Sequence, residues 1–449
     1  MTTPLHLQGL RAYALLWAGQ GVGALGLGLT AFAQAVWLWD QTHSVTASSL
    51  VTLATTLPAF LAAPWVGALV DRWHTHLRRV LALGDGARLL LALLTLGLLH
   101  AGQLTPALLY ALLAAESVFT AFHWPAASAA ARALLRPDEY TRGSGVQMLA
   151  LSASGVLAAP LGALLYPRVG LGGVVALDVL GSVLALGSVL LLRLPARTGA
   201  DTPLAAPLGL RDTLRRGLRF LAARRPLLTL QLVLTGGYFV QGVYAALLTP
   251  LVLSLEAGGQ GRLAQVSMAG GGAALLGGAL LSVWRGWSRQ TPVFVAGWTL
   301  VLLGVLGTGL SGAPGVWAAC AALIALGIAA FGTANQAIWL QQTPLEIQGT
   351  VFALRRMLGM STLPLAAALS GPLVDRVLAP QVNLPLLGSG TSGAIRLLLV
   401  TLSVLGLLLL AGVVRSGRLR GAEPNPAPAL DRRPDGAATV RAAPGRRTS

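Results

Sequence analysis

Long apolar runs dominate this sequence and limit the folds that it can adopt. Twelve of them, each near the ~20 residues that cross a bilayer as a helix, alternate with short segments that carry the arginines. The runs are continuous and rich in Leu, Ala and Gly, without the alternation of a barrel strand, so helices are expected. With 55% hydrophobic and 10% charged residues, the chain has more apolar surface than a soluble fold can bury. We therefore predict an all-α integral membrane protein.

The twelve predicted transmembrane helices fall into two groups of six. In the first half they cover residues 13–37, 48–70, 80–100, 106–130, 144–166 and 173–194. In the second half they cover residues 226–253, 263–284, 292–311, 315–340, 350–378 and 393–414. We therefore expect a cytoplasmic N-terminal segment (1–12), a six-helix bundle (13–194), a basic cytoplasmic linker (195–225), a second six-helix bundle (226–414) and a disordered basic tail (415–449).

The arginines predict how the chain is oriented in the membrane. All 32 Lys or Arg positions are arginine, and 27 of them lie on one side if the N-terminus is cytoplasmic. The other side has Arg168, Arg262, Arg376 and Arg396, while Arg88 lies within a span. This bias follows the positive-inside rule. We therefore expect a multi-pass protein of the cell (inner) membrane, embedded in the lipid bilayer with both termini in the cytoplasm.

The composition argues against several classes of function. The net charge of +17 reflects arginines in the loops and the tail, so no nucleic-acid partner is expected. Without lysine, the chain cannot form the phosphate-binding loop of an ATP-driven pump. The single cysteine, Cys320, rules out an internal disulfide and a cysteine metal cluster. We expect no enzyme activity, no cofactor and no metal site.

Five stretches of the chain resemble one family of transporters. They are 10–20 (LRAYALLWAGQ), 67–79 (GALVDRWHTHLRR), 214–228 (LRRGLRFLAARRPLL), 335–356 (NQAIWLQQTPLEIQGTVFALRR) and 370–376 (SGPLVDR). In this order they resemble the major facilitator superfamily, and most closely its drug and siderophore exporter branch, which includes macrolide efflux proteins and the enterobactin exporter. The resemblance implies a carrier whose two bundles rock around a central substrate site. We expect a monomer that binds a small-molecule substrate.

Charged residues near the predicted cytoplasmic ends of the helices are candidates for gating. Asp71 can pair with a neighbouring arginine or remain a solvated loop charge. The resemblance implies another partner, the helix start at Gly349, and this contact would break when the cytoplasmic side opens. Asp85 and Arg88, three residues apart, share a helix face and can pair. The full set of gating candidates is Asp71, Arg72, Arg78, Arg79, Asp85, Arg88, Gly349 and Arg355.

The pattern of segment 67–79 is not repeated where the symmetry of two bundles would place it. The equivalent loop of the second half, residues 284–289, has no Asp. A similar segment, GPLVDR at 371–376, is expected on the opposite side of the membrane from GALVDR at 67–72. We therefore interpret this likeness as coincidental and predict no two-sided gate from the sequence.

Ionisable residues within the spans are the candidates for proton coupling. Glu116 lies ten residues into the fourth span, where a charge costs about 2.5–3.5 kcal/mol. Low dielectric favours the neutral carboxyl, as a proton carrier needs, although a hydrogen-bonded structural Glu is the alternative. His123, seven residues later, falls on the same helix face. Asp178 can bind a proton or a cationic substrate, or can bind an adjacent backbone group or Arg168.

Polar and aromatic residues within the spans are the candidates for substrate binding. They are Gln147, Gln231, Tyr238, Gln241, Tyr244, Asn335 and Gln336. Such side chains either line a cavity for bulky amphipathic compounds or hold helices together by hydrogen bonds. We expect proton-coupled efflux of amphipathic drug-like compounds or siderophores. Uptake of a nutrient or metabolite, and a non-transporting membrane scaffold or sensor, are the alternatives.

Overall fold

The computed structural model describes residues 9–72, 77–122, 130, 134–136, 139–192, 210–255, 259–283, 289–344 and 347–419. The first half contains α1 (Gly9–Thr42), α2 (Val45–Arg72), α3 (Leu77–His100), α4 (Pro106–Thr120) and α6 (Tyr140–Leu191). The second half contains α7 (Leu210–Ala223), α8 (Arg225–Leu255), α9 (Gln260–Val283), α10 (Gln290–Leu310), α11 (Pro314–Gln342) and α14 (Gly390–Arg415). Between α11 and α14 lie α12 (Gln348–Met360), α13 (Thr362–Pro372), the π-helix η4 (Leu373–Leu378) and a hairpin of β1 (Asn383–Leu384) with β2 (Gly388–Ser389).

The described helices form the predicted twelve spans. Ten helical segments are long and apolar enough to cross a membrane, and α4 is a shorter apolar helix. One of the ten, α6, has two arms that meet at Gly170, whose φ of 64° is open to glycine without steric cost. Counting both arms and α4 gives twelve spans within the described residues. The fifth and sixth spans, predicted as separate helices, are therefore joined without a loop.

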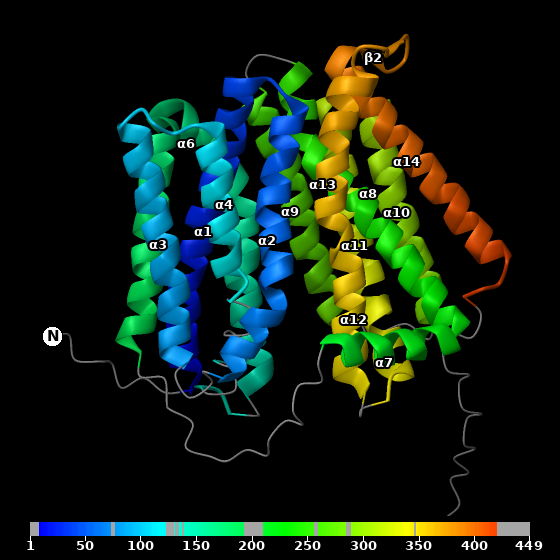
Figure 1. The fold of residues 1–449 in the computed structure, drawn as a ribbon, viewed down its shortest axis with the longest axis horizontal. Helices are drawn as coiled ribbons and strands as arrows, with labels where there is room; N and C mark the ends of the chain where they lie inside the picture. The colour runs from blue at the N-terminus through cyan, green and yellow to red at the C-terminus, as the bar shows by residue number, and fades with distance from the viewer. Residues whose placement is uncertain are drawn as a thin grey trace, which may run out of the picture.

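The spans pack as two bundles that stand side by side (Figure 1). We call the end at which α1 begins the inner end, because the arginines predict that it is cytoplasmic, and the opposite end the outer end. Helix α2 packs on α8 and α13, and α6 packs on α9, so these helices connect the bundles. The amphipathic helix α7 lies across the inner end of the C-terminal bundle (Figure 1).

The two bundles share a buried apolar core at the outer end. The core of the C-terminal bundle continues into the N-terminal bundle through Phe32, Val36 and Trp39, near the outer end of α1. Toward the inner end, α1 instead belongs to a separate apolar cluster, in which its Leu16 packs with residues such as Leu81 of α3. The described members of this cluster all belong to the N-terminal bundle. The apolar contact between the described parts of the two bundles is therefore concentrated toward the outer end.

Arg396 ties together the outer end of the C-terminal bundle. Its guanidinium donates to the carbonyl oxygens of Gly309 at 2.9 Å and Leu310 at 2.8 Å, at the end of α10. It also donates to the carbonyl oxygens of Leu386 at 3.3 Å and Leu387 at 3.1 Å, in the hairpin loop. One side chain thus satisfies acceptors that a helix end and a turn leave without partners.

Arg396→Gln is expected to lower the free energy of unfolding by about 2 kcal/mol, because hydrogen bonds from a charged donor are lost. The measurement is the thermal unfolding midpoint of the purified protein in detergent. Arg415→Gln, at the exposed end of α14, is the control and should leave the midpoint unchanged. Equal midpoints for both variants would show that the four contacts of Arg396 do not stabilise the fold.

Candidate functional site

Three ionisable side chains from three helices meet inside the N-terminal bundle, and a fourth, Asp85, lies one turn away on α3. Arg88 of α3 lies between Glu116 of α4, with Nε to Oε1 at 3.7 Å, and Asp178 of α6, with Nη2 to Oδ1 at 3.8 Å. Asp85, one turn before Arg88, accepts a hydrogen bond of 2.7 Å from Gln20 Nε2 on α1. We call Asp85, Arg88, Glu116 and Asp178 the charge cluster. Arg88, Glu116 and Asp178 lie on three different helices, so the fold rather than one helix face brings these three together.

The charge cluster has more acids than bases. Three carboxyl groups accompany one guanidinium, and arginine keeps its charge in proteins. Asp85, Arg88 and Asp178 are nearly inaccessible to solvent, at 1%, 4% and 2% exposure. Excess negative charge in such a place is costly, so uptake of a proton or a cation is favoured. Among the described residues, no group of three His, Cys, Asp or Glu side chains could hold a metal ion.

A polar stripe on α1 completes the surroundings of the charge cluster. Gln20, Gly23, Thr30 and Gln34 follow each other at steps of three, seven and four, which places them on one helix face. Gly23 accepts a hydrogen bond of 3.3 Å from Arg88 Nη2 through its carbonyl oxygen. These residues are not among the predicted site residues, although their spacing within an apolar span was a usable signal.

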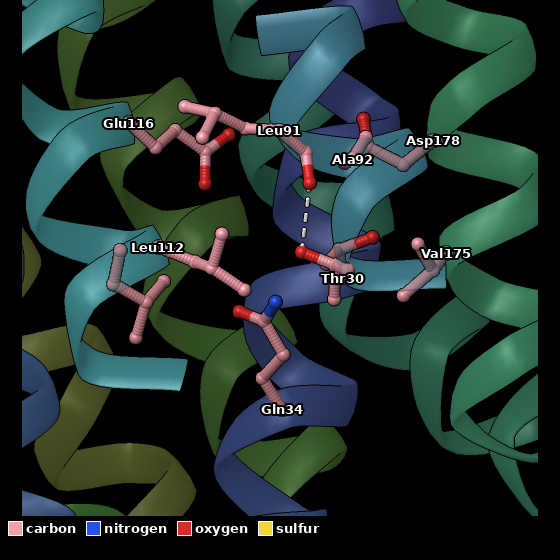
Figure 2. A pocket seen from close by; sticks show the side chains of 10 residues that line it. Thr30, Gln34, Leu91, Ala92, Leu112, Glu116, Val175 and Asp178 are labelled. Carbon is pink, nitrogen blue, oxygen red and sulfur yellow. Dashed lines mark hydrogen bonds between the residues drawn. The ribbon is translucent and has the colours of Figure 1, made fainter. Parts of the chain in front are cut away.

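A small pocket lies beside the charge cluster (Figure 2). It is lined by Thr30 and Gln34 of α1, Leu91, Ala92 and Thr95 of α3, Leu112, Leu113 and Glu116 of α4, and Val175 and Asp178 of α6. Figure 2 shows Glu116 and Asp178 approaching it from opposite sides. The free space is enough for about one water molecule, far less than a drug-sized ligand needs. The pocket therefore fits a water molecule rather than a bulky substrate.

The predicted gating residues at the end of α2 are only partly described. Arg78 and Arg79 are exposed at the start of α3, and the Arg78 guanidinium donates to the backbone carbonyl of Leu190. Asp71 and Arg72 belong to α2, but their side chains lie outside the described part of the structure.

Two further predicted positions have surroundings outside the described part of the structure. Gly349 belongs to α12, and the contacts around it are likewise outside the described part, so its pairing with Asp71 stays a prediction. His123 also falls outside the described residues.

Three predicted site residues come together in the inner half of the C-terminal bundle. Gln231 Nε2 donates to the backbone carbonyl of Arg355 at 3.3 Å. The Arg355 guanidinium carbon lies 4.5 Å from the ring centre of Trp339 and 4.9 Å from that of Phe352. Asn335 Oδ1 accepts a hydrogen bond of 3.1 Å from Trp339 Nε1. Gln231, Arg355 and Asn335 thus form one group of polar and cation–π contacts across α8, α11 and α12.

The other candidates for substrate binding are distributed over both bundles. Tyr244 is buried in the core of the C-terminal bundle, whereas Gln336 is exposed. Tyr238 and Gln241 are half-buried on α8. Gln147 is half-buried on the first arm of α6, where its Oε1 accepts a hydrogen bond of 3.3 Å from a tyrosine hydroxyl of α1.

Sequence relatives of the chain are transporters. The profile of the Major Facilitator Superfamily matches residues 16–367. Macrolide efflux protein A of Streptococcus pyogenes is 27% identical over 392 residues, which cover 84% of this chain and 92% of that protein. Macrolide efflux protein A of Enterococcus faecalis is 27% identical over 314 residues, 66% of this chain and 92% of that protein.

Solved structures share the same arrangement of helices. A bacterial homolog of the human lysosomal transporter Spinster superposes with a TM-score of 0.68 at 15% identity, over 93% of this chain and 99% of that one. The nucleoside transporter NupG superposes with a TM-score of 0.67 at 12% identity, over 90% of this chain and 99% of that one. At such identities the likeness concerns the fold alone. Together with the match of the family profile to most of the sequence, it shows that this chain is a multi-pass membrane transporter, not an enzyme, and belongs to the major facilitator superfamily.

Proposed function

We propose that the protein exports amphipathic small molecules from the cell in exchange for protons. The observation that carries the proton part of this proposal is the charge cluster, in which Arg88 lies between Glu116 and Asp178. The similarity to proteins named macrolide efflux protein A supports outward transport and makes a macrolide the first substrate to test. Siderophores, the other substrates of the exporter branch that the sequence resembles, are the second. We further propose that the chain lies in the inner membrane with both termini in the cytoplasm.

Protonation would change the forces between helices. An ionised Glu116 or Asp178 attracts Arg88 across the boundary between two helices, and a neutral carboxyl does so much less. The protonated and deprotonated forms of the charge cluster therefore favour different arrangements of α3, α4 and α6. A carrier can use this difference because a ligand shifts an equilibrium only by its unequal affinity for two states. Glu116, whose side chain is 18% exposed, is the member more open to proton exchange.

The substrate is expected to bind outside the charge cluster. The adjoining pocket is far too small for an amphipathic drug-like compound. Carriers with two related bundles bind their substrates near mid-membrane where the bundles meet. The proton and the substrate would then occupy separate sites, and their exchange would depend on the movement of the bundles.

Glu116→Gln is expected to uncouple transport from the proton gradient. The amide keeps the size of the side chain but cannot bind and release a proton near neutral pH. In proteoliposomes with an acidic interior, the parent protein should accumulate a labelled macrolide, whereas the variant should not. Exchange of labelled for unlabelled macrolide without a gradient should persist, because it needs no net proton movement.

A control variant separates coupling from general damage. Glu423→Gln changes an acid of the predicted tail and should leave accumulation unchanged. Gradient-driven accumulation that persists in Glu116→Gln would contradict proton coupling through this residue. Accumulation driven by an acidic exterior instead would favour uptake of the compound over export.

A further inference from the structure

Asp375 joins the two bundles at the outer end. Its carboxylate accepts hydrogen bonds from the backbone N–H of Thr46 at 2.7 Å and of Val45 at 3.3 Å. It also accepts a hydrogen bond of 2.8 Å from Ser44 Oγ. These groups form the start of α2, whose first N–H groups have no partner within the helix. An acid of the C-terminal bundle therefore caps a helix of the N-terminal bundle.

The energetics of this contact favour a charged carboxylate. A helix N-terminus has a partial positive charge, which stabilises an anion by about 0.3–1 kcal/mol when exposed and up to about 2 kcal/mol when partly buried. Hydrogen bonds to an ionised acceptor are also stronger than those between neutral groups. Asp375 is half-buried, so water screens the interaction only in part.

The chain around Asp375 brings the two helices into direct contact. At Gly371 a Cβ atom would lie 2.1 Å from Ser49 Oγ and 2.6 Å from the Cα of Thr46, so only glycine allows this approach. One residue after Gly371 comes Pro372, and from Leu373 the helix widens into η4. Single π-helical turns of this kind are frequent at functional sites. Asp375 lies in that turn.

The contact has to break during alternating access. The apolar core that the bundles share near the outer end includes Val36 of α1 and Val45 of α2. Opening the outer end would separate α2 from α13 and η4 and expose this core. The hydrogen bonds of Asp375 would then be lost, because their donors and their acceptor belong to different bundles.

We propose that Asp375 is the latch of the outer end, which holds that end closed and releases α2 when the carrier opens outward. The segment GPLVDR at 371–376 has the same spacing as GALVDR at 67–72. The start of α2 lies beside η4 at the outer end. At the inner end of the same pair of spans, the resemblance to the family implies that Asp71 faces the start of α12 at Gly349. The similarity of GPLVDR to GALVDR, which we interpreted as coincidental, would then have a functional reason. Each segment would supply the aspartate of one latch, and the two latches would close opposite ends of the carrier in turn.

The test measures how often the outer end opens. The single native cysteine is replaced (Cys320→Ala), and Val36→Cys places a reporter in the shared core, where valine is 0% exposed. A membrane-impermeant maleimide is added to intact cells, and the labelling rate is followed. Asp375→Asn keeps the size of the side chain and removes the charge. It should raise the labelling rate roughly threefold to tenfold.

Matched variants distinguish a latch from general loosening. Arg376→Gln removes the neighbouring exposed charge and should leave the labelling rate unchanged. Ser44→Ala removes one of the hydrogen bonds and keeps the carboxylate, so a smaller rise is expected; this variant provides the test if Asp375→Asn does not fold. Each variant is first checked for an unchanged elution profile in size-exclusion chromatography.

Either of two results would overturn the proposal. One is an unchanged labelling rate in correctly folded Asp375→Asn, or in Ser44→Ala if that variant has to replace it. The other is an equal rise in Arg376→Gln. The readout involves neither a substrate nor a proton gradient, so its outcome is independent of the proposed export function.

Discussion

Arg88→Gln is expected to abolish transport and to lower the free energy of unfolding by about 3–5 kcal/mol at neutral pH. Arg88 lies 3.7 Å from Glu116 and 3.8 Å from Asp178, and its side chain is only 5% exposed. Glutamine keeps part of the volume but removes the positive charge from between two acids. Water cannot replace that charge where the side chains are this deeply buried. The measurements are macrolide accumulation in proteoliposomes and the thermal unfolding midpoint.

Acid should partly rescue the stability of Arg88→Gln. Protonation neutralises Glu116 and Asp178, so the variant then buries less uncompensated charge. The gap between the midpoints of the parent and the variant should therefore be largest at about pH 8 and should narrow toward about pH 5. Arg168→Gln, at an exposed position on α6, should show no such gap at any pH. A gap that stays constant with pH would mean that Arg88 stabilises the bundle by packing and not by its charge.

Gly237→Ala is expected to destabilise the C-terminal bundle by at least about 3 kcal/mol, at the upper end of the usual cost of overpacking. The added Cβ atom would lie 1.9 Å and 2.1 Å from two ring carbons of Trp298. That indole is 2% exposed and stacks on Phe331 with ring centres 4.3 Å apart. It therefore cannot move aside without breaking the stack. The expected result is a large fall in the unfolding midpoint or loss of folded protein in the membrane.

The neighbouring glycine provides a matched control. At Gly236 a Cβ atom would meet nothing within 4 Å. Gly236→Ala should therefore be neutral or should stabilise the helix by up to about 1 kcal/mol, because alanine loses less backbone entropy. Equal losses in the two variants would point to a requirement for glycine in α8 itself and not to the contact with Trp298.

The continuous apolar runs, their lengths and the basic linker between two groups of six were sufficient to predict the fold. The prediction of twelve helices in two bundles is confirmed, because a bilayer permits few other arrangements of such runs. The boundary between the fifth and sixth spans was less accessible. The sequence PRVGLGG at 167–173 resembles a loop, whereas the helix continues to a single turn at Gly170. Composition does not reveal which of several neighbouring glycines adopts a positive φ.

Individual site residues were easier to predict than their partners. Glu116 and Asp178 were recognisable as acids within apolar spans, but helical spacing relates residues of one helix only. It therefore predicted Asp85 as the partner of Arg88, whereas the ion pairs that the structure shows for Arg88 are with Glu116 of α4 and Asp178 of α6. The sequence also provided no sign of the partner of Asp375. The likeness of its segment to that of Asp71 was interpreted as coincidental because the two lie on opposite sides of the membrane. The proposed function of Asp375 depends instead on the helix that begins beside it, which is α2.

The loop-free turn at Gly170 couples the movements of the two arms of α6. One of its arms touches the C-terminal bundle, where Val156 lies against Gly271 of α9, and the other bears Asp178. Because the two arms are joined by Gly170 alone, tilting the first arm also displaces the second. Sliding of the bundles at α9 would thereby shift a carboxylate deep in the opposite half of the molecule.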